Sequence, residues 1–129
     1  MPLYWDASRH ALGLTLLDGA HEQFTLLVRA LNTAGDAEFP ALFAALIAHT
    51  SEHFSDEGRL MRESKYSGLA MHEAEHHRKL GELQQLGRTL KRGHLPLVRA
   101  FVREGLPEWF ESHLATMDLA LIAHLRKSV

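Results

Sequence analysis

Histidine is the unusual feature of this sequence, because ten of its 129 residues are histidines. Imidazole is the commonest metal ligand in proteins and a frequent acid–base group, so the spacing of these residues indicates what chemistry they could support. His53 and Glu57 are four residues apart, as are His72 and His76. On a helix, the two members of such a pair lie on the same face. Together with three further side chains they form a set of seven candidate metal ligands: His21, His53, Glu57, His72, His76, His113 and Asp118.

Four segments of the chain would have to position these side chains, and all four show helical periodicity. Alternation of the kind that predicts strands is nearly absent. The links between the segments are short, which makes consecutive helices antiparallel neighbours. We therefore predict an all-α fold: an antiparallel up-down-up-down four-helix bundle in one domain, residues 1–129. An irregular N-terminal arm over residues 1–16 would precede it, with Leu3 and Trp5 packed against the bundle. The predicted helices, whose apolar residues recur at steps of three and four, cover residues 18–31, 40–64, 68–91 and 96–125.

The candidate ligands lie on helix faces that are otherwise apolar. In the second segment, for example, His53 and Glu57 continue a stripe that also contains Leu46 and Met61. Burying a carboxylate such as Glu57 is costly unless it is paired or bound to a metal. A cluster of buried imidazoles without metal would likewise leave polar groups unsatisfied. Bound metal ions resolve both difficulties.

The composition of the set limits which metals it suits. Five imidazoles and two carboxylates are too many for one tetrahedral zinc ion. They suit two octahedral ions bridged by the carboxylates, with one coordination position left over. An imidazole-rich set with few carboxylates favours iron among the first-row metals.

The last segment contains two features that a regular helix does not accommodate. Asp118 lies five residues after His113, which places the two side chains about 140° apart around a regular helix. Both reach one metal centre only if the helix is widened locally, as in a π-type bulge. Pro107 removes a backbone hydrogen bond and clashes with the preceding turn, so we expect a kink there or two abutting helices.

The ordered set of motifs resembles the single-domain bacterial members of the hemerythrin family. The motifs are His21, then HFSDE at 53–57, HEAEH at 72–76 and HLATMD at 113–118, and the similarity covers nearly the whole chain. Gly58 and Pro107 depart from the family pattern, but neither is a candidate ligand. Other residues that match are Trp5, Asp18, Met61, Tyr66 and Trp109.

This resemblance implies a non-haem di-iron centre that binds O2 reversibly, for oxygen storage, delivery or sensing rather than catalysis. O2 would bind the iron that has only two histidines. An oxo or hydroxo group would join the two ions. The implied ligands are His72, His76 and His113 on one iron, His21 and His53 on the other, and Glu57 and Asp118 bridging the two.

Two classes of enzyme are alternatives. The run from His72 through Glu73 to His76 also matches the HExxH motif of zinc hydrolases, in which the glutamate is the general base. That interpretation leaves the other candidate ligands unexplained. A di-iron oxidase, peroxidase or nitric-oxide reductase is a nearer alternative, although the nitrogen-rich set favours reversible binding over turnover. A sensor would need an output from an unknown protein partner, and a purely structural bundle would bind no metal.

The other histidines have plainer interpretations. We expect His10 and His94 in loops, His77 on the surface and His124 near the end of the last helix. His49 precedes His53 by one helical turn, and its imidazole could donate a hydrogen bond to one of the candidate metal-ligating side chains.

Composition makes several other functions less favourable. The absence of cysteine excludes disulfides and thiolate metal sites, and it suits a reducing cytosol. The net charge of −2 argues against binding to nucleic acid or anionic membranes. The N-terminal sequence lacks the pattern of a signal peptide, and no apolar run is long enough to span a bilayer. We therefore expect a cytoplasmic protein.

Overall fold

The computed structural model describes residues 3–127, and within this range every regular element is helical. The first two residues of the predicted arm lie outside the described residues. The elements are α1 (Ala7–His10), α2 (Thr15–Thr33), α3 (Phe39–Glu63), α4 (Leu69–Lys91), α5 (Leu95–Ala100), the π-helical turn η1 (Phe101–Gly105), α6 (Leu106–His113), the π-helical turn η2 (Leu114–Asp118) and α7 (Leu119–Lys127).

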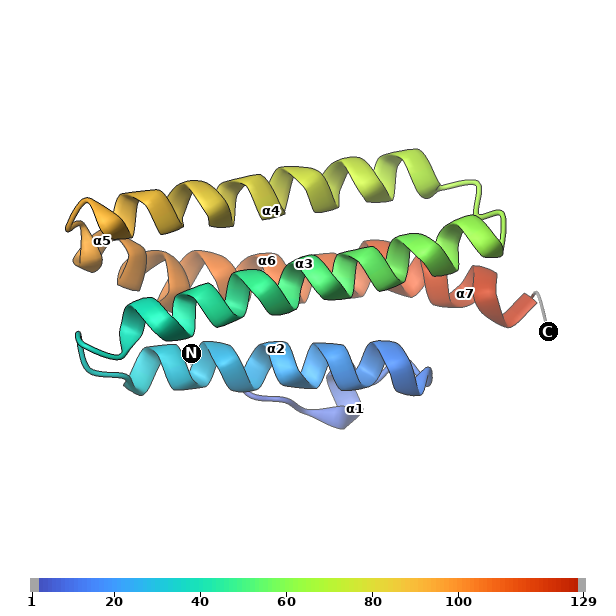
Figure 1. The fold of residues 1–129 in the computed structure, drawn as a ribbon. Helices are drawn as coiled ribbons and strands as arrows, with labels where there is room; N and C mark the ends of the chain where they lie inside the picture. The colour runs from blue at the N-terminus through green and yellow to red at the C-terminus, as the bar shows by residue number, and fades with distance from the viewer. Residues whose placement is uncertain (1–2, 128–129) are drawn as a thin grey trace.

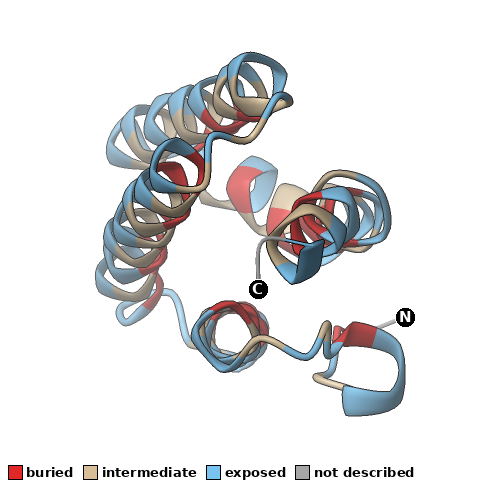
Figure 2. Cartoon of the chain, turned by 90° about the vertical axis from the view of Figure 1, so that its right-hand side faces the viewer, coloured by how far each residue is buried: buried red, intermediate tan, exposed pale blue. Residues whose placement is uncertain are grey.

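Four long helical segments run side by side with alternating direction (Figure 1). The first three are α2, α3 and α4, and the fourth is the unbroken helical run from α5 to α7. Seen from one end of the bundle, their buried surfaces face a common interior (Figure 2). The predicted antiparallel four-helix bundle is confirmed. No helix in residues 3–127 has the length and apolar character needed to cross a membrane.

Local sequence signals explain where the helices begin and end. Pro40 lies in the first turn of α3, where its missing N–H breaks no helical hydrogen bond. Gly93 follows α4 with a φ of +93°, a conformation that glycine adopts without strain, and this reverses the chain into α5. The buried Gly58 does not interrupt α3, which continues to Glu63.

The N-terminal arm is more ordered than predicted. It contains the short helix α1, whose N-terminus is capped by Asp6 through a hydrogen bond from the N–H of Ser8. Asp18 in the first turn of α2 fixes the next part of the arm, because its carboxylate accepts hydrogen bonds from the N–H groups of Leu12 and Gly13. Leu3 is buried, as predicted, and the side chain of Trp5 is half-buried.

Apolar residues form two clusters along the bundle. The larger contains Leu46 on α3 and Phe110 on α6, and the smaller contains Leu17, Met61 and Leu121. On each long segment the candidate ligands lie between residues of the two clusters. The polar side chains therefore form a layer with apolar packing on both sides.

The fourth segment stays helical through Pro107, because the helix adjusts before the proline. In η1 the N–H of Leu106 donates to the carbonyl of Phe101, an i→i−5 bond that widens the turn. Pro107 then lies in the first turn of α6. The widened turn accommodates the missing N–H and the bulk of the proline ring, so the helical run continues.

Candidate metal centre

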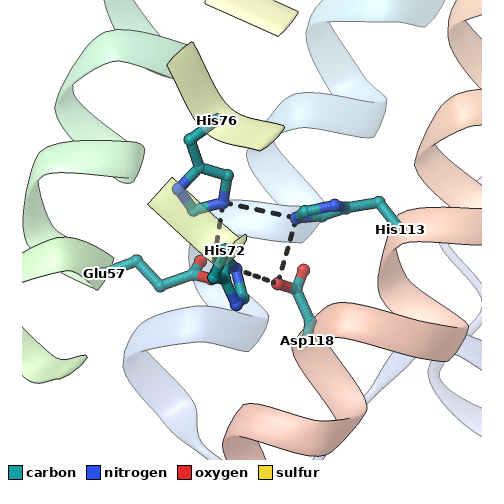
Figure 3. Close-up of side chains that lie close together, drawn as sticks. All are labelled: Glu57, His72, His76, His113 and Asp118. Carbon is teal, nitrogen blue, oxygen red and sulfur yellow. Dashed lines mark hydrogen bonds and ion pairs between the residues drawn. The ribbon is translucent and has the colours of Figure 1, made fainter. Parts of the chain in front are cut away.

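The structure brings all seven candidate ligands together in the interior of the bundle, and Figure 3 shows five of them. Each long segment contributes at least one. Six are at least nine-tenths buried, and His53 is the most exposed, with 11% of its side chain accessible. The contributing elements are α2 (His21), α3 (His53, Glu57), α4 (His72, His76), α6 (His113) and η2 (Asp118).

The carboxylate of Glu57 lies between histidines of α3 and α4. Its Oε1 is 2.6 Å from Nε2 of His72 and 3.6 Å from Nε2 of His76. Its Oε2 is 3.0 Å from Nε2 of His53. The two oxygens therefore face different histidines, which is the arrangement that a bridging carboxylate needs.

The carboxylate of Asp118 likewise lies between histidines of different helices, here α6, α4 and α2. Its Oδ1 is 3.2 Å from Nε2 of His113 and 3.3 Å from Nε2 of His72, and its Oδ2 is 3.1 Å from Nε2 of His21. The π-turn η2 makes this possible, because the N–H of Leu119 bonds to the carbonyl of Leu114, five residues earlier. The distortion predicted from the five-residue spacing is confirmed.

The donor atoms fall into two groups that share one residue. Within each group, one potential ligand atom from every residue lies within 4.8 Å of the others. Glu57 belongs to both. The larger group is Glu57, His72, His76, His113 and Asp118, and the smaller is His21, His53 and Glu57.

The donor atoms approach one another but most are not aligned for hydrogen bonding. Within residues 3–127, both carboxylate oxygens of Glu57 and Nε2 of His21 and of His72 are buried without a hydrogen-bond partner. His76 and His113 direct their Nε2 atoms at each other, 3.3 Å apart (Figure 3). Unsatisfied buried polar atoms are costly, and positively charged ions among them would remove that cost. The residues present therefore fit a metal centre.

The electrostatics of the metal-free cluster show how strongly its members interact. Burial alone would lower the pKa of His72, but contacts with Asp118 and Glu57 outweigh it and raise that pKa to about 9. Burial, followed by repulsion from His72 and His113, lowers the pKa of His76 to about 2. Burial opposes ionisation of Asp118, but the surrounding histidines hold its pKa well below the usual range. His76 therefore offers a neutral imidazole and Asp118 a carboxylate, the forms that bind metals.

Aromatic rings fix the orientation of two of the histidines. Phe54 stacks on His76 with ring centroids 3.8 Å apart and planes inclined by 3°. Trp109 stacks on His113 at 4.7 Å and 20°. The indole N–H of Trp109 donates to Glu75 at 3.0 Å, which holds the ring in place.

A small cavity adjoins the cluster on the side of His21 and His53. Its volume of about 20 Å³ is enough for one water-sized molecule. Most of its wall is aromatic. The lining residues are His21, Phe24, His49, Thr50, His53, Phe54, Trp109, Phe110, His113 and Asp118.

The prediction for His10 was wrong. The residue ends α1 and is 1% exposed. Its Nδ1 accepts a hydrogen bond from the N–H of Asp6, and its Nε2 lies 2.8 Å from Oε1 of Glu111 on α6. Because the contact with Glu111 spans 101 residues, no local sequence signal indicated it.

A buried lysine was also missed. On α4 the structure buries Lys79, which is 5% exposed. The ammonium group lies 5.1 Å from the ring centre of Trp109 and 2.6 Å from Oε1 of Glu82. The spacing of His72, His76 and Leu83 could have indicated this position, since residue 79 lies on the same face.

The remaining histidines lie outside the cluster. His77 is exposed and His94 lies in the link before α5, as predicted. Nε2 of His124 donates to the carbonyl of Ser64. Burial lowers the pKa of His49, whose Nε2 donates to the carbonyl of Ala20 at 3.0 Å rather than to a candidate ligand. Its ring lies parallel to that of His53, at 6.4 Å.

Comparisons with known proteins agree with this arrangement. The chain is 34% identical to a bacteriohemerythrin of Ralstonia nicotianae over 116 residues, which cover 90% of this chain and 83% of the relative. It is 32% identical to a myohemerythrin of Sipunculus nudus over 117 residues, covering 91% and 88%. A crystal structure of wild-type hemerythrin shares the fold, with a TM-score of 0.84, 23% identity and coverage of 97% and 98%. The family described as "Hemerythrin HHE cation binding domain" matches residues 12–125, and the chain belongs to this family.

Proposed function

We propose that this chain binds O2 reversibly at a non-haem centre of two iron ions held by the seven clustered residues. One observation carries the proposal: each buried carboxylate turns one oxygen toward the histidines of the larger group and the other toward those of the smaller. The contacts of Glu57 with His72 and His53, and those of Asp118 with His113 and His21, show this directly.

The histidines would be divided unequally between the two ions. Glu57, Asp118 and an oxo or hydroxo group would bridge the two ions. Together these three bridging groups would occupy three of the six positions on each octahedral ion. The three histidines of one ion complete its coordination, whereas the two on the other leave a position for an external ligand. The proposed assignment is His72, His76 and His113 to the first ion and His21 and His53 to the second.

When bound, the ferrous pair supplies the electrons that O2 takes up and returns when it leaves. The chain's own residues hold the centre and keep it dry. The rings of Phe24, Phe54 and Phe110 line the cavity beside the proposed open position. Water and protons help bound oxygen to leave in a reduced form. An apolar wall around a cavity this small therefore favours its release as O2.

The arrangement of the HExxH segment argues against a zinc hydrolase. His72 and His76 turn inward, but Glu73 lies between α4 and α3, where its carboxylate pairs with Arg62 at 3.2 Å. A general base for hydrolysis would have to reach a water held by the two histidines. Glu73 is paired with Arg62 instead, which argues against this role.

A di-iron enzyme is the second candidate, since the same metals can activate oxygen. The cluster has two carboxylates among seven residues, fewer than the carboxylate-rich di-iron bundles use. Together with the kinship to bacteriohemerythrin and myohemerythrin, this favours binding over turnover. A cytoplasmic location and a protein partner stay predictions.

The test is reconstitution with ferrous iron without oxygen, followed by metal analysis and ultraviolet–visible spectra. We expect about two iron ions per chain and a visible band that forms with O2 and disappears when O2 is removed. About one metal ion per chain, a preference for zinc, or a band that never reverses would contradict the proposal. Steady oxidation of an added reductant with O2 would instead support the enzyme alternative.

A further inference from the structure

Thr50 lines the cavity and carries a buried hydroxyl group that has no hydrogen-bond partner in residues 3–127. The residue is 2% exposed and lines the cavity together with His53, the ligand candidate one helical turn later on α3. Apart from the clustered ligand atoms, its Oγ1 is the one buried side-chain oxygen in that range left in this state.

Four other threonines within helices behave differently. Thr25, Thr33, Thr89 and Thr116 each donate the hydroxyl hydrogen to a backbone carbonyl three or four residues earlier. This is the usual way in which a helical threonine satisfies its side chain. Thr50 is a full turn or more from both ends of α3, so such a carbonyl exists for it, yet the bond is absent.

An unsatisfied hydroxyl at this place has a chemical consequence. Removing a hydroxyl from water without giving it a partner costs free energy, which a hydrogen bond to a ligand would recover. The neighbouring wall consists largely of the rings of Phe24, Phe54, Trp109 and Phe110. Binding sites commonly combine an apolar wall with one or a few polar groups that orient the ligand.

We propose that Thr50 is a positioning residue whose Oγ1–H donates a hydrogen bond to the small ligand held in this cavity. The ligand class is a diatomic or linear triatomic molecule with lone pairs on its outer atom, such as O2 or azide. The inference rests on the proposed function, because the ligand reaches the cavity by binding beside His21 and His53. The hydrogen bond would favour ligands that carry negative charge on the outer atom.

The test compares azide binding to the iron-loaded ferric protein and to three variants. Thr50→Val keeps the side-chain shape but removes the hydroxyl, and Thr50→Ser keeps the hydroxyl. Thr25→Val is the matched control, since Thr25 is 0% exposed and lies outside the cavity. Dissociation constants come from spectroscopic titration, with iron content measured for every sample.

We expect Thr50→Val to weaken azide binding by about tenfold or more, because hydrogen bonds to charged groups are among the stronger ones. Thr50→Ser should bind nearly as tightly as the wild type, and Thr25→Val should leave azide affinity unchanged. Equal affinity in Thr50→Val and the wild type would overturn the inference. Equal weakening in Thr50→Val and Thr25→Val would also overturn it, because that would show a general effect of losing a buried hydroxyl.

A measurement on the wild type covers the case in which Thr50→Val does not fold. In a crystal of the azide-bound ferric protein, Oγ1 of Thr50 should lie within about 3.2 Å of the outer azide nitrogen. A separation beyond about 4 Å excludes the hydrogen bond. A wild-type chain that binds no iron would refute the proposed function itself, whereas these outcomes in iron-loaded protein concern Thr50 alone.

Discussion

The two groups of candidate ligands differ in how completely the protein encloses them. In the larger group, His76 and His113 are each covered by a stacked aromatic ring, Phe54 and Trp109. The smaller group adjoins the cavity, which His113 and Asp118 of the larger group also line, and its His53 is the most exposed member of the cluster. This fits the proposal that the larger group holds only a metal ion, whereas the smaller group holds a metal ion that also takes an external ligand. The two groups share only α3, through Glu57, so each is surrounded by different helices and different side chains.

The largest expected effect concerns the residue that both groups share. Glu57→Ala should weaken iron binding by more than about 100-fold, because losing even an outer partner of a metal ligand commonly costs between 10-fold and 100-fold. Iron retained after dialysis against a chelator is the measurement.

His77→Ala is the control for Glu57→Ala, since it removes an exposed imidazole from the same region. It should keep about two iron ions per chain. If both variants retained iron equally, Glu57 could not be the shared ligand.

The next prediction tests whether the two groups differ in function as well as in enclosure. Azide soaked into crystals of the ferric protein should bind only the iron held by His21 and His53. The proposed ligand assignment leaves a vacant coordination position there, and the cavity provides the space. Azide on the iron of His72, His76 and His113, or across both ions, would reverse the proposed assignment.

The two π-turns of the fourth segment differ in whether they position candidate ligands. In η2 the widened turn lets His113 and Asp118 contact each other, whereas η1 lies beside Pro107 and contains no candidate ligand. Pro107→Ala should therefore leave about two iron ions per chain. It should change the free energy of unfolding by about 1 kcal/mol or less, as is usual when a proline compatible with its site is replaced.

Denaturant unfolding and metal analysis of the same Pro107→Ala samples test this. Loss of iron from the variant would show that η1 also positions the centre.

Much of the centre could be predicted from the sequence because its signals are local. Helical spacing places His53 with Glu57 and His72 with His76, and the awkward interval between His113 and Asp118 predicted a π-type turn that the structure contains. The helical segments followed from the periodicity of apolar residues in the same way.

What the sequence did not reveal depends on contacts between distant segments. His10 is buried because Glu111, at the other end of the chain, accepts its hydrogen bond. The position of Lys79 could have been inferred from spacing, but the contact of its charge with the face of Trp109 joins α4 to α6 and has no local signal. The unpaired hydroxyl of Thr50 is a property of the assembled cavity wall, and no pattern within α3 marks it.

The smallest expected effect concerns the N-terminal arm, whose His10 packs against Phe110 on the wall of the cavity. The ring of His10 meets Phe110 edge-on at 5.7 Å, and Phe110 in turn meets His21 at 5.9 Å and lines the cavity. His10→Ala would remove the support behind Phe110, so this ring could shift and admit water. We expect iron content to stay at about two per chain while the oxygenated form oxidises a few times faster, since water promotes that loss. Arg9→Ala is the control, because Arg9 contacts the same Glu111 at 3.1 Å from an exposed position. The decay of the oxygen-dependent visible band measures both rates. If the two variants decayed at the wild-type rate, the arm would stabilise the fold without protecting the centre.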